Sequence, residues 1–339
     1  MKKQIQILCT LTLGITLLLS SAVAQDKVKL AQTGFQFLSV ISDAEVAALG
    51  GSATALELGS SALFFNPATM AHLDGFVEVS ASMNQFIAGI NYNAFSAAIK
   101  PLQGKFGVLG VTLQSIDYGD NIFGTIVDPL DPKGYRDTGE FSPTSVSLGV
   151  GYAKQLSSFF AVGGHFKYAT QNLGNTMIPT VDDTLNTSKE VKNELSATAA
   201  DFGTYFNTGV RSINFGMSVR NYSKEVQFVS ESFQLPLAFT LGVSSDLIEL
   251  ITGRASSFQR AVLSMEMTHF RAHPEQVMVG LDYQLMETFA FRAGYVANNY
   301  EDDISFGFGI NKFGLKADYA YTPFSIFGNV QRITIRFSL

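Results

Sequence analysis

The feature that most constrains this chain is an alternation of apolar with small or polar residues, which recurs from Gly75 to the C terminus. Every second residue is apolar in the segment 146–152, and the segment 162–168 nearly repeats the pattern with one glycine. A period of two predicts β-strands with one apolar face. Because the pattern covers most of the chain, it predicts an all-β fold.

The composition suggests where that apolar face lies. Hydrophobic residues make up 46% of the 339 residues and charged residues only 15%, against roughly 25% charged in ordinary soluble domains. After the first 24 residues, however, the chain has no run of about 18 apolar residues, as a transmembrane helix would require. Apolar residues spread over strands are typical of a transmembrane β-barrel, and a soluble periplasmic β-sandwich is the remaining alternative.

The first 24 residues have the pattern of a secretory signal peptide. Lys2 and Lys3 precede the apolar stretch 5–19, and Ala22-Val23-Ala24 forms a cleavage site. Cys9, the only cysteine, lies inside this segment. The mature chain therefore offers neither a disulfide framework nor a thiolate metal site.

Export and charge together define the compartment. Removal of the signal peptide makes the net charge more negative than -6, which argues against a nucleic-acid partner. An exported, cysteine-free barrel fits the outer membrane of a diderm bacterium, with outer-membrane lipid around its apolar face.

Residues 25–74 do not alternate, and they predict a short, mostly helical N-terminal plug ahead of a barrel at 75–339. The stretch 44–49 reads as a helix that Gly50 and Gly51 end, and Asn66-Pro67-Ala68 follows two phenylalanines. The segment is too apolar for a free linker, so we expect it inside the barrel or under its mouth.

The barrel region divides into about 14 antiparallel strands, most of them long enough to cross a bilayer. If the first strand runs outward, the long connections 117–143 and 173–194 fall outside and the short turns fall in the periplasm. One connection, 246–258, is long, apolar and helix-like, yet falls in the periplasm; either it is a periplasmic cap or the count is off by two. The predicted strands are 76–84, 86–99, 105–116, 144–155, 160–171, 195–206, 210–221, 235–245, 259–270, 276–285, 289–298, 304–310, 313–321 and 329–339.

Three motifs in the plug, 37–40, 43–51 and 64–71, resemble the PorV/PorQ family, as do the residues 318–333. These outer-membrane proteins are similar to FadL-type long-chain fatty-acid transporters, and both groups share a plug with Asn-Pro-Ala inside a 14-stranded barrel. One departure is Glu45, where the family usually has an arginine, which questions any plug salt bridge made through that position. The last strand also resembles the C-terminal signal read by barrel-assembly machinery.

The resemblance implies an accessory or partner-binding role in type IX protein secretion, with a secretion-channel protein as partner. The alternative is passive transport of long-chain fatty acids or other hydrophobic compounds. Neither needs a cofactor or a catalytic residue, and we expect no enzyme activity.

Motifs for catalysis or metal binding are weak. His269 and His273 span a strand end and a loop, and no serine lies in a Gly-x-Ser-x-Gly turn. Acidic residues at 182–183 and 301–303 lie in predicted external loops, where a solvated role is favoured over calcium binding. Glycines at 149, 151, 307 and 309 are mid-strand, where small residues leave room for a plug.

Charged residues recur on the face that points into the lumen. We expect them to pair with one another and with the plug: Arg220, Glu266, Asp282, Arg292 and Asp318, joined by Lys316, Arg332 and Arg336. The alternative is a pocket in which a barrel arginine holds a carboxylate and phenylalanines line the rest: Phe35, Phe37, Phe64 and Phe65.

Overall fold

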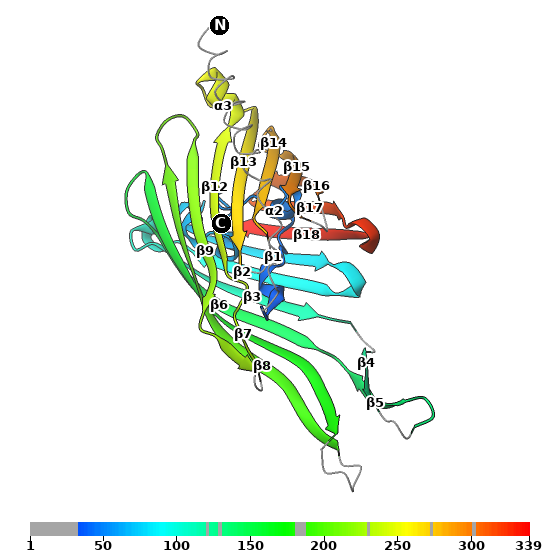
Figure 1. Cartoon of the computed structure of the whole chain (residues 1–339). Coiled ribbons are helices and arrows are strands. Elements are labelled where there is room, and N and C mark those ends of the chain that lie inside the picture. Colours follow the sequence, from blue (N-terminus) through cyan, green and yellow to red (C-terminus); the bar gives the residue numbers. More distant parts are fainter. Residues whose placement is uncertain are drawn as a thin grey trace.

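The computed structural model describes residues 33–119, 122–127, 131–179, 188–228, 231–271, 274–299 and 303–339. The predicted signal peptide at 1–24 lies outside them. In the described part, 14 antiparallel strands close into a barrel in the order β1-β18-β17-β16-β15-β14-β13-β12-β9-β8-β7-β6-β3-β2 (Figure 1). The expected all-β barrel is confirmed.

The barrel strands are β1 (Val77–Gln85), β2 (Asn91–Ile99), β3 (Val108–Asp117), β6 (Thr144–Gln155), β7 (Phe160–Pro179), β8 (Ser188–Asn207), β9 (Asn214–Ser223), β12 (Ala238–Asp246), β13 (Gln259–Phe270), β14 (Gln276–Leu285), β15 (Phe289–Ala297), β16 (Ile304–Lys312), β17 (Leu315–Pro323) and β18 (Asn329–Ser338). Three of them, β6, β13 and β14, have the predicted bounds. No helix in the described residues is long and apolar enough to span a membrane.

Most differences from the predicted bounds lie at turns. β2 begins five residues later than expected because η4 (Ile87–Gly89) makes a turn there, with Ala88 in the left-handed region at φ 57°. β7 and β8 instead continue well past their predicted ends and are 20 residues long each. Beyond Ala199 in the direction of its N terminus, β8 no longer pairs with β9.

The long connections contain small elements of their own. β4 (Ile122–Val127) and β5 (Tyr135–Phe141) form a hairpin after β3, and β10 (Val226–Phe228) pairs with β11 (Glu231–Phe233) after β9. The hairpin β4–β5 contacts β7, so it joins the extended β7–β8 pair in an arm that projects from the barrel (Figure 1). We call β4, β5 and the extensions of β7 and β8 the external arm, because they follow the loop parity of outer-membrane barrels.

The connection between β12 and β13, predicted to be either a periplasmic cap or the result of a strand count off by two, contains helix α3 (Leu247–Thr252). The strand count of 14 is right, so an error of two does not explain it. α3 lies at the same end of the barrel as the short turns, in the place predicted for a periplasmic cap, and Ile251 and Phe258 remain exposed there.

The two faces of the wall follow the predicted alternation. On β6, Leu148 and Val150 are exposed on the outer face, whereas Ser147 is buried on the inner face. The seam closes where β1 pairs with β18. A band of exposed apolar side chains on a closed barrel is stable only in lipid, since it would cost roughly 25 cal/mol per Å² in water.

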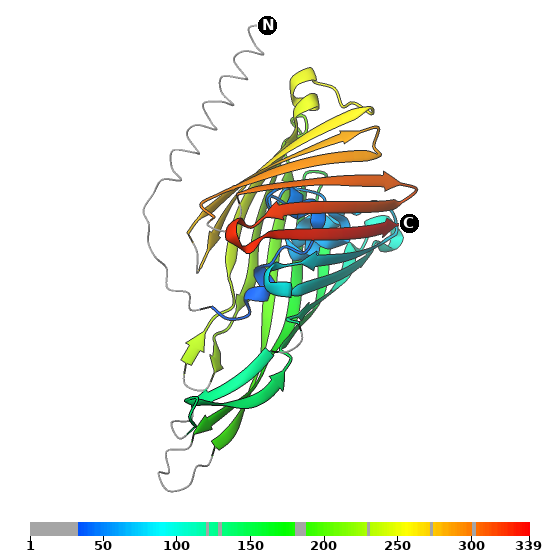
Figure 2. The same cartoon turned by 90° about the vertical axis from the view of Figure 1, so that its right-hand side faces the viewer.

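The plug fills the lumen, as Figure 2 shows in blue. Its elements are η1 (Gln36–Ser39), α2 (Ala44–Ala48), η2 (Gly59–Phe64) and η3 (Pro67–His72). Helix α2 contacts β15 to β18, η2 contacts β1 to β3, and η3 contacts β6 to β8. The plug therefore touches the wall on opposite sides.

Close contact between plug and wall depends on glycine. A Cβ atom on any of nine inward-facing glycines would press against plug atoms; for example, Gly163 lies against the backbone of Pro67 and Gly203 against Asn66. The expectation that mid-strand glycines make room for the plug is confirmed for Gly151 and Gly307, whereas Gly149 and Gly309 make room for wall side chains. We call the nine the glycine collar: Gly110, Gly151, Gly163, Gly203, Gly216, Gly242, Gly280, Gly294 and Gly307.

Candidate functional site

Helix α2 presents two carboxylates to the barrel wall. Asp43 caps the helix by accepting a hydrogen bond from the Val46 amide, and the next residue but one is Glu45. Glu45 is ion-paired with Arg292 at 3.0 Å, with Lys316 at 2.6 Å and with Arg336. The plug is thereby joined to β15, β17 and β18 at one point.

The wall side of this cluster is itself paired, as expected for Asp282, Arg292 and Asp318. Arg292 lies 2.7 Å from Asp318 and 3.2 Å from Asp282, while Arg336 also meets Asp43. All these side chains are buried except that of Lys316, which is about a quarter exposed. Each charge has opposite charges around it, which offsets the cost of removing it from water. We call the set the ionic cluster: Asp43, Glu45, Asp282, Arg292, Lys316, Asp318 and Arg336.

The titration of Glu45 reflects this surrounding charge. Burial alone would raise the pKa of its carboxyl, but the positive charges of Lys316, Arg292 and Arg336 outweigh burial and hold that pKa well below its ordinary value. Glu45 is therefore ionised in the folded protein. Position 45 therefore makes a plug salt bridge even though glutamate stands where the PorV/PorQ family usually has arginine. The basic partners of Glu45 come from the barrel wall.

The Asn-Pro-Ala motif connects plug and wall rather than facing an open pocket. Asn66 is fully buried; its Nδ2 donates to the Thr54 carbonyl at 2.7 Å and to the Thr204 carbonyl of β8 at 3.0 Å. Its Oδ1 accepts from the Ala68 amide at 3.1 Å, while Pro67 begins η3. One side chain thus caps η3, joins it to the 54–55 turn and attaches both to β8.

Gly50 and Gly51 end helix α2 as predicted, with φ values of 65° and 88°. Gly51 donates its amide to the Val46 carbonyl, and Gly50 donates to Ser305 Oγ of β16 at 3.1 Å. A side chain at Gly50 would meet the backbone of Tyr295. The turn therefore lies directly against the barrel wall. Glycine allows this because it adopts the left-handed conformation and has no side chain to separate the two backbones.

Two further lumen residues predicted from the sequence also hold the plug. Glu266 accepts hydrogen bonds from the amides of Ala53 at 2.9 Å and Thr54 at 2.8 Å. Arg220 Nη1 donates to the Phe64 carbonyl at 3.2 Å. Arg332 Nε donates to the Ile41 carbonyl at 2.9 Å, so all eight lumen residues named from the sequence are attached to the plug or to the ionic cluster.

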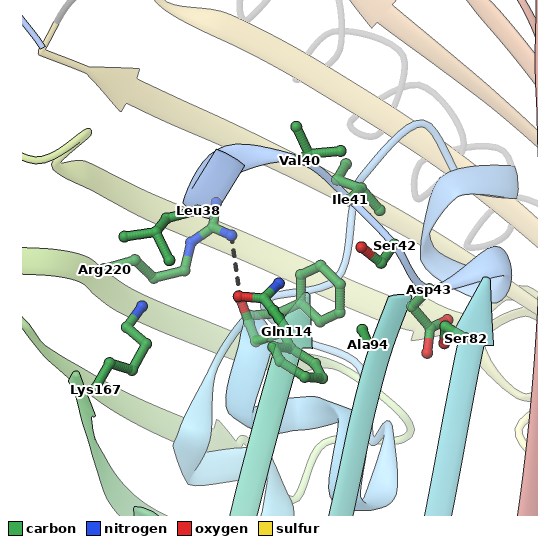
Figure 3. Close-up of a pocket in the computed structure, with 12 residues that line it drawn as sticks. Leu38, Val40, Ile41, Ser42, Asp43, Ser82, Ala94, Gln114, Lys167 and Arg220 are labelled. Carbon is green, nitrogen blue, oxygen red and sulfur yellow. Dashed lines mark hydrogen bonds between the residues drawn. The ribbon is translucent and has the colours of Figure 1, made fainter. Parts of the chain in front are cut away.

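The four phenylalanines do not share one pocket. Phe35 and Phe37 are buried near the external end, with ring centroids 6.1 Å apart, and Phe35 lies 6.2 Å from Phe233. Phe64 and Phe65 line a cavity beneath them, with Lys167 and Arg220 to one side (Figure 3). Its volume is about 20 Å³, roughly the space for one water molecule.

A larger space opens at the periplasmic end. This vestibule of about 520 Å³ is bounded by the plug at Glu45 and Leu49 and by wall residues such as Lys316. It is lined mainly by polar groups, including His72, Asp246 and Arg260. It resembles a hydrated porin interior more than a site for an apolar ligand.

A buried polar chain across β3, β7 and β8 was not predicted as a site. His165 lies 2.9 Å from Thr112 Oγ1 and 3.1 Å from Asp201, and Lys167 pairs with Asp201 at 2.8 Å. The order of groups is that of a hydrolase triad, but Thr112 and His165 are buried and so cross-link strands. The sequence did contain a signal for this chain, since His165 and Lys167 alternate with the exposed Phe166 on one strand and so place two polar side chains on its inner face.

Metal ligands do not gather in the described part of the chain, where no group of three or more acidic, histidine or cysteine residues has suitable geometry. His269 pairs with Glu275 at 2.8 Å on the surface. His273, the acidic pair at 182–183 and two of the three acids at 301–303 lie outside the described residues.

Comparison with known proteins gives a family and a fold. The family model of the type IX secretion system membrane protein PorP/SprF matches residues 135–324, more than half of the chain. No curated protein sequence matches it. The PorV/PorQ resemblance is not confirmed, since the matching family is a different one of the same secretion system, and the matched range leaves out the plug motifs.

The fold is similar to solved hydrocarbon channels. The toluene transporter TbuX of Ralstonia pickettii is 12% identical, with a TM-score of 0.57 over 86% of this chain and 95% of that one. The toluene transporter TodX of Pseudomonas putida is 12% identical, with a TM-score of 0.55 over 86% and 95%. A FadL homologue of Pseudomonas aeruginosa is 12% identical, with a TM-score of 0.52 over 88% and 98%.

At such low identity these neighbours show the fold alone: a plugged, FadL-like outer-membrane barrel. The family match adds the secretion system in which proteins of this type are found. The chain belongs to the PorP/SprF family of type IX secretion system membrane proteins.

Proposed function

We propose that this protein is a non-enzymatic accessory component of type IX secretion that binds a secretion-channel protein at the outer membrane. The external arm carries the proposal. It lies within or beside the family match at 135–324 and projects from the wall, where a second protein can reach it (Figure 1). The filled lumen also favours a binding role over conduction.

The plug motifs suggest a more specific role within secretion, that of PorV/PorQ proteins, which accompany the translocon or the cell-surface attachment complex. The motifs 43–51 and 64–71 support it, because here they build the ionic cluster and the Asn66 contacts that fix the plug. A fixed plug leaves the barrel as a rigid platform for the arm.

The test is purification from native outer membranes with and without the arm hairpin. Deletion of Ile122–Phe141 should abolish co-purification of a large channel subunit while the barrel still shows heat-modifiable migration. The matched control, Ile251→Ser on exposed α3, should leave co-purification unchanged. Absence of any channel subunit with the intact protein contradicts the proposal.

The second candidate is passive transport of long-chain fatty acids or other hydrophobic compounds. The lining of the cavity of about 20 Å³ favours it, because Phe64 and Phe65 lie there with Lys167 and Arg220. This combination of apolar and cationic groups suits a carboxylate with a hydrocarbon tail, once the plug moves to enlarge the space. The similar structures named toluene transporters share the fold. Extraction of lipid from the purified protein, and uptake by a deletion strain, test it; unchanged uptake and no bound ligand exclude it.

A further inference from the structure

Each periplasmic connection of the barrel carries a large, exposed apolar side chain. These connections join β2 to β3, β6 to β7, β8 to β9, β12 to β13, β14 to β15 and β16 to β17. In every one of them, at least one apolar residue has more than half of its surface exposed. We take one such residue from each connection and call the set the periplasmic rim: Leu102, Leu156, Val210, Phe258, Met286 and Phe313.

The rim is continuous with the lipid-facing side of the wall. On β16 the outward-facing row that contains Ile310 ends at Lys312. Lys312 Nζ lies 5.0 Å from the centroid of the Phe313 ring, so Phe313, which is 90% exposed, extends this outer row. At the turn between β2 and β3, the hydroxyl of Tyr152 on the outer face of β6 donates to the Phe106 carbonyl at 2.8 Å. Both turns therefore border the apolar band of the barrel.

Three rim residues have a backbone conformation that bulky residues rarely adopt. Leu102, Met286 and Phe313 lie in the left-handed region, with φ values of 49°, 54° and 57°. Asparagine and glycine are the usual residues at such positions of tight hairpin turns, because they adopt this conformation with little strain. An apolar side chain thus occurs where the turn itself favours a small polar residue. This indicates a use for the side chain outside the turn.

The two ends of the barrel differ in charge. By sequence, the six periplasmic connections contain four basic and two acidic residues, whereas the seven external connections contain four basic and thirteen acidic residues. Bases also lie beside aromatic rings at the periplasmic end: Lys105 Nζ is 5.9 Å from the centroid of the Phe106 ring, and Lys312 is placed in the same way over Phe313. This end therefore suits a surface that presents anionic groups next to apolar ones.

We propose that the periplasmic rim inserts into the phospholipid leaflet that faces the periplasm. The rim side chains lie at the boundary between headgroups and acyl chains, and Lys105 and Lys312 bind headgroup phosphates while their stems cover the neighbouring rings. Continuity with the lipid-facing wall and the positive charge of the turns favour a lipid surface over a periplasmic protein. The rim goes beyond partner binding, because it sets the depth of the barrel in the membrane.

The first test uses tryptophan, which the chain lacks. The full chain with Phe313→Trp is reconstituted in vesicles of phosphatidylcholine whose acyl chains carry bromine, a contact quencher of tryptophan fluorescence. Its emission should be quenched to at least half the extent seen for Phe308→Trp on the lipid-facing side of β16. The control Phe123→Trp, exposed in the external arm, should not be quenched. An unquenched Phe313→Trp protein overturns the proposal.

The second test concerns the lysines. In the Phe313→Trp protein, brominated phosphatidylglycerol mixed into phosphatidylcholine vesicles should quench roughly twofold more than the same fraction of brominated phosphatidylcholine, because the anionic headgroup gathers near the bases. Lys105→Gln/Lys312→Gln should remove this excess, whereas Lys224→Gln at the external end should keep it. An excess that persists in the double variant overturns the role of the two lysines.

Two further variants separate lipid contact from other uses of Phe313. Phe313→Asn should fold in detergent at least as well as the parent, because asparagine suits the left-handed turn; loss of folding would show that the ring serves the turn and would overturn the proposal. Phe313→Cys, labelled with a photoreactive maleimide in native outer membranes, should cross-link to phospholipid. A cross-link to a periplasmic protein in its place also overturns the proposal.

Discussion

At the scale of single residues, two buried side chains attach the plug by different physics. Glu45 is held by charge, with three bases around one carboxylate. Asn66 is held by directional hydrogen bonds to two carbonyl groups and one amide. Removal of either leaves its partners buried without compensation, which is the costly outcome for polar groups.

Replacement of the Glu45 carboxylate should destabilise the protein. Glu45→Gln keeps the size of the side chain but leaves Arg292, Lys316 and Arg336 short of one negative charge, with an expected cost of about 3 kcal/mol. Urea unfolding in detergent, followed by heat-modifiable migration, measures it. Glu57→Gln, at a half-exposed carboxylate, is the control and should change stability little.

The low pKa of Glu45 predicts how the stability cost of Glu45→Gln changes with pH. The pKa of Glu45 is lower in the folded protein than its ordinary value of 4.5, so its contribution is fully present above about pH 4.5 and is lost as the pH falls through the folded pKa. The stability difference between the parent and Glu45→Gln should therefore shrink below pH 4.5. A difference that grows on acidification would contradict the ionic cluster.

Asn66 makes a second prediction at this scale. Asn66→Ala removes the donors to the Thr54 and Thr204 carbonyls, each of which then lacks that partner at a cost of roughly 1–3 kcal/mol. Limited proteolysis should cut the plug faster in this variant. Asn91→Ala, which removes only an exposed contact to Gly89, should leave the cleavage rate unchanged; similar rates for both variants would argue against a fixed Asn66.

At the scale of elements, the glycine collar and the strands that carry it decide how closely the plug can lie. Gly163 and Gly164 are neighbours on β7 but have opposite surroundings. A Cβ at Gly163 would overlap the backbone of Pro67 and Ala68, whereas at Gly164 the nearest atom is 3.7 Å away. Backbone cannot move aside as a flexible side chain can.

Gly163→Ala should therefore reduce the yield of folded, heat-modifiable protein or displace η3, while Gly164→Ala should fold like the parent. The refolded fraction on a gel and the protease sensitivity of the plug measure the two effects. If both alanine variants fold equally well, the collar does not limit the fit.

The strands were predictable from the sequence because alternation is a local property and the bilayer enforces it on every strand. The hairpin β4–β5 was missed because it lies outside the bilayer, where no apolar face is imposed. The polar chain at His165 and Asp201 depends on contacts between strands that are distant in the sequence. The pocket expected around Phe64 is small because Leu38 and Val40 pack into it, and no local pattern shows that.

At the scale of the whole molecule, the plug separates two spaces of very different size, a cavity of about 20 Å³ and a periplasmic vestibule of about 520 Å³. The ionic cluster, Asn66 and the glycine collar hold the plug between them on opposite walls. The barrel is thus a plugged body with an arm at one end and an open, polar recess at the other.

The filled lumen predicts the electrical behaviour of the protein. Reconstituted in planar bilayers, the folded chain should show no steady ion conductance, because the plug lies in the lumen and contacts the wall on opposite sides. An open porin in the same bilayer provides the control. Stable ohmic steps from the unmodified protein would show that the plug leaves the lumen.

The seam between β1 and β18 has a consequence for biogenesis. The Phe76 amide donates to the Leu339 carbonyl at 2.5 Å, so the first residues after the plug pair with the last strand of the barrel. Because the plug lies in close contact with nine glycines of the wall, we expect it to be enclosed while that seam is still open. Insertion of the plug and closure of the wall would then be coupled. A chain whose β1 and β18 paired before the plug was inside would not reach the native fold.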